Sequence, residues 1–274
     1  MTRATGLNQK NIFSLQFTMP DFNILKYKQR GLCILLDGEM IWKNCTNTYH
    51  ILSNDILFIP PGNYAAKTKT EGCRVLWLPL HMEFLRGFLN RFGGLLSHIE
   101  RHDSPACRLI PCSQFPLLTE SVRGFVNLLA HDCPPALIQL RTEELLLLLS
   151  LGKQGSLLMS VLRQLSNRQA ERLQTFMETH YLNEWKLNNF AREFGMGLTS
   201  FKELFSSVYG ISPRAWISEQ RILYAHQLLL NSEMSIADIT LESGFSSQSY
   251  FTQSYRKRFG CTPNRARYGK DPMQ

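Results

Sequence analysis

An internal repeat in the C-terminal third is the feature that most constrains how this chain of 274 residues can fold. A pattern that begins at Gly195 begins again at Gly244. The second copy has one extra residue in its turn, so the apolar positions that follow recur at an offset of 50 residues. Two copies are too few for a solenoid, so the pattern indicates a duplicated structural unit. The matching pairs are Phe201 and Phe251, Phe205 and Tyr255, Tyr209 and Phe259, Gly210 and Gly260, and Pro213 and Pro263.

Each copy of the repeat predicts two short helices joined by a turn. The first helix covers Leu187 to Phe194 in one copy and Ile236 to Ser243 in the other. The glycine that follows each of them can leave a helix in the left-handed conformation. The second helix carries aromatic residues at positions i, i+4 and i+8, which share one buried face. This is the pattern of a helix-turn-helix, and two such units in tandem predict a DNA-binding domain.

The opposite faces of the second helices indicate which residues would contact DNA. Hydroxyl and amide side chains near a helix N-terminus suit base edges, whereas lysine and arginine suit guanine or phosphate. For any single residue an ordinary solvated face is the simpler interpretation, but the two matched faces together favour DNA. The candidates are Leu198, Thr199, Lys202 and Ser206 in the first unit and Gln248, Ser249, Thr252, Gln253, Arg256 and Lys257 in the second.

The segment between the two units can be judged by its length. Pro213 is well placed to begin a helix that runs to Leu230, and such a helix is roughly 27 Å long. Successive major-groove faces lie about 34 Å apart. With the flanking turns added, this helix could hold the two recognition helices in adjacent grooves.

The charge distribution supports a polyanionic partner. The net charge of +8 by itself fits an ordinary basic protein. However, the last part of the chain, from 243 to 270, contains six basic residues and no acidic one, as expected of a phosphate-contacting face. The basic residues are Arg256, Lys257, Arg258, Arg265, Arg267 and Lys270.

The first 80 residues have the pattern of β-structure. We expect strands at Gly31–Leu36, Glu39–Lys43, Ile56–Ile59 and Arg74–Leu80. Apolar residues on both sides of Asp37-Gly38 predict a hairpin at that point. Several short strands at this spacing favour a small barrel or sandwich.

Three helices are expected next, at Met82–Phe92, Leu117–His131 and Ala136–Leu151, the last two forming a hairpin around the prolines 134 and 135. The third has leucines all round it, so it must be covered on every side. One side can pack on the β-structure, and a second copy of the chain is the simplest cover for the other. The alternative is a helix fully buried within one chain. The candidate dimerisation residues are Leu137, Leu140, Arg141, Glu144 and Leu148.

A weak linker signal divides the chain into residues 1–160 and 167–274. The seven cysteines form no CxxC pair, which indicates reduced thiols and a cytoplasmic location. The longest apolar run, Leu145 to Leu149, is too short to span a bilayer, so no membrane association is expected.

The second repeat resembles the AraC/XylS family of transcriptional regulators. The residues that carry the resemblance are Ile236, Ala237, Ile239, Gly244, Phe245, Ser249, Tyr250, Phe251, Lys257, Phe259, Gly260, Thr262 and Pro263. Thr240, Tyr255 and Gly197 depart from the residues usual in the family. The resemblance implies an α+β protein. In it, a cupin-like β-barrel with a helical hairpin regulates an all-α domain of two helix-turn-helix units.

Four further stretches, 157–168, 180–187, 193–199 and 224–231, resemble a branch of this family that activates type III secretion genes. That resemblance implies promoter DNA and RNA polymerase as partners, in addition to the second copy of the chain expected from the leucine-rich helix. It also implies control by a protein anti-activator.

Two other readings stay open. The barrel could bind a small-molecule effector, although Trp42, Phe58 and Trp77 would fill it if they point inward. The chain could also be an enzyme with an appended DNA-binding module. A metal-dependent cupin needs a clustered His-x-His, and His50 and His81 are isolated, while His98 and His102 have no evident third ligand. We therefore expect no metal, no cofactor and no catalytic residue.

Overall fold

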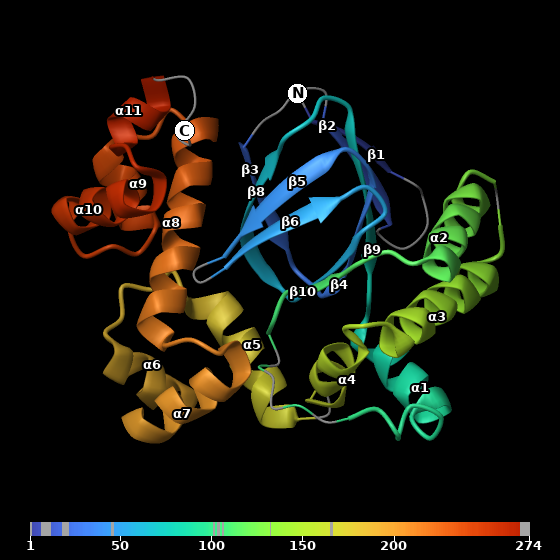
Figure 1. The fold of residues 1–274 in the computed structure, drawn as a ribbon. Coiled ribbons are helices and arrows are strands. Elements are labelled where there is room, and N and C mark those ends of the chain that lie inside the picture. Colours follow the sequence, from blue (N-terminus) through green and yellow to red (C-terminus); the bar gives the residue numbers. More distant parts are fainter. Residues whose placement is uncertain are drawn as a thin grey trace.

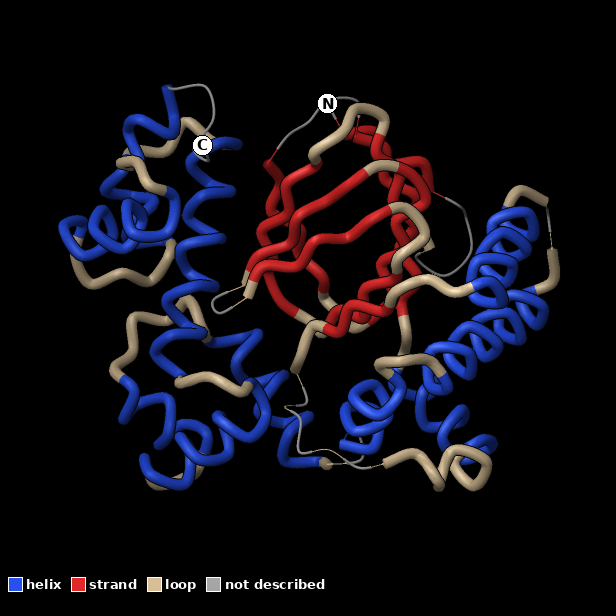
Figure 2. Tube along the Cα trace, in the orientation of Figure 1, coloured by secondary structure: helices blue, strands red, loops and turns tan. Residues whose placement is uncertain are grey.

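The computed structural model describes residues 2–6, 12–17, 22–44, 47–100, 102, 105, 107–131, 133–164 and 167–268. Two antiparallel sheets occupy the centre of the molecule, and helices lie on both outer sides (Figures 1 and 2). The six-stranded sheet has the order β1-β2-β9-β4-β7-β10 and the four-stranded sheet the order β3-β8-β5-β6. The strands are β1 (Thr2–Gly6), β2 (Phe13–Phe17), β3 (Phe22–Tyr27), β4 (Gly31–Asp37), β5 (Glu39–Lys43), β6 (Thr48–Leu52), β7 (Ile56–Ile59), β8 (Gly62–Thr68), β9 (Cys73–Pro79) and β10 (Ile110–Cys112).

The hairpin predicted at Asp37-Gly38 is wrong. Strand β4 pairs with β7 and β9, whereas β5 pairs with β6 and β8. The Asp37-Gly38 turn therefore carries the chain from one sheet into the other, with a register irregularity just before it and a φ of 97° at Gly38. Among the described strands none pairs across the two sheets, so the expected barrel is not closed and the sheets face each other as two layers.

Aromatic side chains fill the space between the two sheets. Tyr27, Trp42, Tyr64 and Trp77 are buried there, and the ring centroids of Tyr27 and Trp77 lie 4.0 Å apart. Phe58, whose direction the sequence left open, does not fill this space, because side chains alternate along β7 and Phe58 points to the opposite face.

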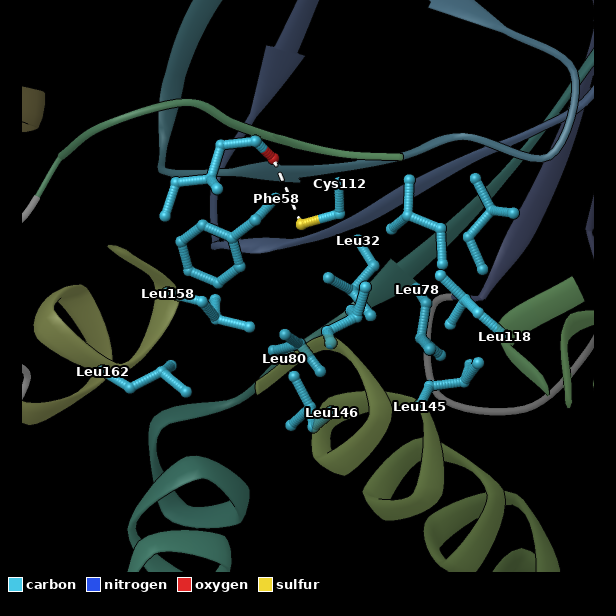
Figure 3. Close-up of a cluster of buried hydrophobic side chains, with 14 of the residues drawn as sticks. Leu32, Phe58, Leu78, Leu80, Cys112, Leu118, Leu145, Leu146, Leu158 and Leu162 are labelled. Atoms are coloured by element: carbon cyan, nitrogen blue, oxygen red, sulfur yellow. Dashed lines mark hydrogen bonds between the residues drawn. The ribbon is translucent and has the colours of Figure 1, made fainter. Parts of the chain in front are cut away.

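Four helices cover the outer face of the six-stranded sheet: α1 (Met82–Phe92), α2 (Pro116–Leu129), α3 (Pro135–Leu151) and α4 (Gly155–Gln164). Figure 3 shows Phe58 and Leu78 from the sheet meeting Leu145, Leu146 and Leu162 from the helices. The three helices predicted in this region are confirmed to within two residues at each end. No single described helix is long and apolar enough to cross a membrane, and α3 and α4 pass that test only as a pair bent by 118°.

The remaining helices form the C-terminal half: α5 (Arg168–His180), α6 (Leu187–Phe194), α7 (Leu198–Tyr209), α8 (Pro213–Asn231), α9 (Ile236–Glu242), α10 (Gln248–Phe259) and α11 (Pro263–Tyr268). The long helix α8 runs beside the four-stranded sheet (Figure 1). Ile24 and Ala65 of that sheet pack into the core around α8. A buried polar contact reinforces this packing, because Asn63 of β8 is bonded to Gln220 of α8 at 2.9 Å. Separately, Arg30, just before β4, donates to Gln174 of α5 at 2.9 Å.

Candidate nucleic-acid interface

The two predicted helix-turn-helix units are α6–α7 and α9–α10. The turn glycines Gly195 and Gly244 have φ angles of 85° and 75°, a region that costs residues with a Cβ energy. Helices α7 and α10 are both 12 residues long, and both end at a glycine in the same conformation, Gly210 or Gly260. The repeat in the sequence is therefore a repeat of two backbone turns as well as of side chains.

The repeated aromatic residues form the buried faces of α7 and α10. Phe201 and Phe205 in the first unit, like Phe251 and Tyr255 in the second, are fully buried. Tyr255 departs from the family pattern, and its hydroxyl lies 2.5 Å from Nδ1 of His226 on α8. Burial, reinforced by the charge of Arg258, lowers the pKa of His226 to about 4, so this imidazole is neutral near pH 7.

The other two departures from the family pattern are accommodated locally. Thr240 is buried, and its hydroxyl donates a 2.7 Å hydrogen bond to the carbonyl of Ile236. Gly197 stands at the N-cap of α7 without a side-chain bond, whereas the Ser247 hydroxyl caps α10 by accepting from the amide of Tyr250. The two recognition helices thus begin at equivalent places with different caps.

All ten candidate DNA-binding residues lie on α7 or α10, away from the aromatic faces. Leu198 and Thr252 are half-buried, and the other eight are exposed. The structure gathers the second-unit candidates together, because all six line one hollow of about 800 Å³ with Thr262. The six are Gln248, Ser249, Thr252, Gln253, Arg256 and Lys257.

In the first unit, Leu198 and Lys202 line a groove of about 510 Å³ between the two units. Thr199 and Ser206 are exposed on α7 but do not line it. The groove adds three candidates for DNA contact that the sequence analysis missed: Lys186, Arg214 and Tyr250. Lys186 precedes α6 and Arg214 lies in the first turn of α8, so basic residues at helix starts were the available signal.

The basic stretch contributes less charge to this surface than its sequence predicts. Arg258 forms an ion pair at 2.9 Å with Glu219 of α8, and both side chains are largely buried. Arg267 donates to the carbonyl oxygen of Met234 at 2.6 Å. These two arginines hold the second unit together, because partners distant in sequence draw them inward. Arg256 and Lys257 remain exposed on α10, whereas Lys270 lies outside the described residues.

The predicted dimerisation residues lie along one side of α3. Leu137 and Leu140 are exposed, at 43% and 56%. Arg141 and Glu144 form an ion pair at 2.7 Å on the same surface, and Leu148 is half-buried against the core. The sheet-facing side of the helix is instead buried through Leu145, Leu146 and Leu149, which belong to the core of the N-terminal half.

Burial keeps cysteine thiols of this protein in their unreactive, protonated form. Burial raises the pKa of Cys112 to about 12, which leaves its thiol protonated and unreactive near neutral pH. Within the part of the chain that the structure describes, no three His, Cys, Asp or Glu side chains are grouped to hold a metal ion. His98 instead contacts the carbonyl oxygen of Leu95 through Nδ1 at 2.9 Å.

Comparison with known proteins agrees with this architecture. The profile described as the ExsA N-terminal regulatory domain matches residues 30–161, and a helix-turn-helix domain profile matches 190–268. The transcriptional regulator ExsA of Pseudomonas aeruginosa is 57% identical over 99% of this chain and 98% of its own length. The virulence regulon transcriptional activator VirF of Yersinia enterocolitica is 56% identical over 94% of this chain and 96% of its own length.

Among solved structures, ToxT from Vibrio cholerae has a TM-score of 0.59, with 17% identity, over 94% of this chain and 98% of that one. At this identity the likeness shows the fold alone, which is antiparallel sheets followed by a helical C-terminal half. The full-length relatives are transcriptional regulators, and this sets aside the enzyme alternative. The chain therefore belongs to the AraC/XylS family of DNA-binding transcriptional activators, in the group that resembles ExsA.

Proposed function

We propose that this protein activates type III secretion genes in the cytoplasm by placing α7 and α10 in neighbouring major grooves of promoter DNA. The observation that carries the proposal is the pair of equivalent exposed polar faces on α7 and α10. The relative named as a virulence regulon activator supports the class of target gene. In this proposal residues 1–160 form the regulatory unit and residues 167–274 the DNA-binding unit.

The connecting helix supports simultaneous binding of both units. Helix α8 has 19 residues, which corresponds to about 28 Å. The turns on either side bring the separation towards the roughly 34 Å between successive major-groove faces. The groove between the units, with Lys186, Lys202 and Arg214 on its walls, would then face the phosphates between the two half-sites.

Footprinting of the purified protein on promoters of type III secretion genes tests the proposal. We expect protection of two adjacent half-sites. Lys202→Ala and Arg256→Ala should each weaken binding by about 1–3 kcal/mol if the side chain contacts a base. Lys153→Ala, an exposed lysine between α3 and α4, is the matched control and should bind as the wild type does. Wild-type affinity in both Lys202→Ala and Arg256→Ala would show that the outward faces are wrongly assigned.

We also propose that two copies associate through the α3 residues Leu137, Leu140, Arg141, Glu144 and Leu148 when they occupy adjacent sites. Leu137 and Leu140 are the exposed leucines of this surface, at 43% and 56%. Covering such leucines is favourable by about 25 cal/mol for each Å² removed from water. The Arg141–Glu144 pair at the same surface suits the polar rim of an interface.

Two exposed leucines allow a matched test of the dimer. Leu140 is 56% exposed on α3, and Leu52 is 55% exposed on β6. Leu140→Asp should abolish cooperative filling of adjacent sites while single-site binding persists, and Leu52→Asp should leave cooperativity unchanged. Unchanged cooperativity in Leu140→Asp would remove α3 from the interface.

For regulation, we propose control by a protein anti-activator, with RNA polymerase as the partner in activation. The four aromatic side chains between the sheets, Tyr27, Trp42, Tyr64 and Trp77, favour this over a small effector held inside. Titration with the anti-activator of the same secretion system should release the full chain from promoter DNA. Release by a small metabolite alone would favour the effector alternative.

A further inference from the structure

The loop that leads into the first helix-turn-helix unit is attached to the long connecting helix α8. Arg221, in the middle of α8, donates from Nε to the carbonyl oxygen of Tyr181 at 2.7 Å and from Nη2 to that of Asn183 at 2.6 Å. Both carbonyls belong to the α5–α6 loop (residues 181–186), which leads into the first unit. One guanidinium thus ties this loop to the helix that connects the units.

The turn of the second unit rests on the same loop. A Cβ atom added to Gly244 would lie 2.2 Å from the carbonyl oxygen of Leu182 and 3.1 Å from Nε of Arg221. Only a residue without a side chain fits there. At the equivalent Gly195 of the first unit, the nearest atom to an added Cβ is Nη2 of Arg172, at 3.7 Å. The close approach is therefore particular to Gly244 and is not a general requirement of the turn.

These contacts have a mechanical consequence. A single helix joining two units lets each unit rotate about its own junction with that helix. A second attachment, away from the helix axis, removes this freedom. Arginine suits the task because its planar guanidinium carries several donors in a fixed arrangement, whereas lysine offers a single charged point. The acceptors are backbone carbonyls, so the attachment also fixes the course of the loop into α6.

We propose that Arg221 is a positioning residue that fixes the separation of α7 and α10, and thereby the half-site spacing that the protein accepts. In this role Arg221 holds the α5–α6 loop, and the turn at Gly244 seats on that loop. The inference rests on the proposed function, in which both recognition helices bind DNA together. Arg221 also lines the groove between the units, but this role rests on its two carbonyl contacts and requires no contact with DNA.

The test measures affinity of the full chain for duplexes whose two half-sites are set at the natural spacing or one base pair longer or shorter. One base pair turns the second half-site by about 34° and moves it by about 3.4 Å. We expect the wild type to prefer the natural spacing by roughly tenfold or more, an effect of the size of a mismatched base pair. Arg221→Gln should bind the natural spacing more weakly and reduce that preference to less than about threefold.

Arg172→Gln is the matched control, because Arg172 also donates to a carbonyl, that of Phe194 at 2.8 Å, but this bond joins α5 to the end of α6 and does not involve α8. It should keep the wild-type spacing preference even where its affinity falls. Arg221→Lys, which can reach one carbonyl, should have an intermediate preference and serves as the test if Arg221→Gln does not fold.

The outcomes separate the two proposals. A wild type without spacing preference would overturn two-groove binding and the inference together. A spacing preference that is as sharp in the Arg221 variants as in the wild type would overturn the role of Arg221 alone. A preference lost equally in Arg172→Gln would also overturn it, because general loosening of the first unit would then be the cause.

Discussion

Alanine at the two turn glycines should destabilise the protein by clearly different amounts. Both glycines have positive φ, 85° at Gly195 and 75° at Gly244, and alanine there costs roughly 1–2 kcal/mol. Reduced freedom of the unfolded chain offsets about 0.4–1 kcal/mol of this. At Gly244 the new Cβ would also lie only 2.2 Å from the carbonyl oxygen of Leu182. The two atoms must separate by at least 0.8 Å to reach 3.0 Å, the shortest distance that such a contact tolerates. Overpacking of this kind costs about 1–3 kcal/mol.

We therefore expect Gly195→Ala to lower the free energy of unfolding by about 1 kcal/mol and Gly244→Ala by about 3 kcal/mol. Urea unfolding of the full chain, followed by circular dichroism, measures both. Asparagine tolerates the left-handed conformation, so Gly195→Asn should be close to wild type while Gly244→Asn stays strongly destabilised. Equal losses at the two positions, within about 0.5 kcal/mol, would refute the close contact with Leu182.

Three further changes test the contacts that hold the second unit and the four-stranded sheet to α8. Because burial lowers the pKa of His226 from 6.5 to about 4, the unfolded chain binds a proton that the folded chain does not between these values. Stability should fall by up to about 3 kcal/mol as the pH drops through that window. His226→Phe should flatten this pH dependence of the free energy of unfolding, measured by urea titration. An unchanged dependence would show that His226 is not its cause. Glu219→Gln leaves the charge of Arg258 without its partner in a largely buried site and should cost about 3 kcal/mol in thermal or urea unfolding. Adding Arg258→Met should restore most of it, and a melting curve like that of the wild type for Glu219→Gln would contradict the buried pair. For Asn63→Ala and Gln220→Ala, a double-mutant cycle should give a coupling of about 1–2 kcal/mol, whereas additive effects would show that the sheet is not docked on α8 through this pair.

The C-terminal half was predictable because its helix ends are determined by residues at those ends. Pro213 begins α8, and Gly195 follows α6, at the positions expected from the sequence. Proline at the start and glycine after the end of a helix act through their own backbone preferences and need no distant partner. The spacing of Phe201 and Phe205 similarly fixes which side of α7 is buried.

The N-terminal half was less predictable because strand pairing depends on distant segments. Asp37-Gly38 has the composition of a tight hairpin, yet β4 and β5 pair with strands from 48 to 79 instead of with each other. Gly38 does adopt the positive φ that tight turns favour. A turn alone cannot determine whether the next strand stays in the same sheet. The same limitation hid the direction of Phe58, which depends on where the helices pack.

In the candidate site, too, the features set by local sequence were predictable and those set by distant residues were not. The outward positions of α7 and α10 follow from helical periodicity, so the ten residues fall on the expected faces. The inward turn of Arg258 depends on Glu219, 39 residues away, and the role of Gly244 depends on the carbonyl of Leu182. No local pattern contains such pairs. Counting basic residues therefore overestimated the charge available to DNA.

Duplication gave the two units one scaffold, and α8 accounts for how they have diverged. At the first unit α8 presents Trp216, whose ring lies 5.9 Å from that of Phe205, centroid to centroid. At the second unit it presents His226, and the position equivalent to Phe205 is Tyr255, whose hydroxyl reaches the imidazole. A phenyl ring opposite a neutral histidine would leave that ring nitrogen without this bond, whereas a tyrosine opposite the indole would need another polar partner. The substitution is therefore explained by the neighbour on α8, and it indicates that the connecting helix and the repeats form one packed unit.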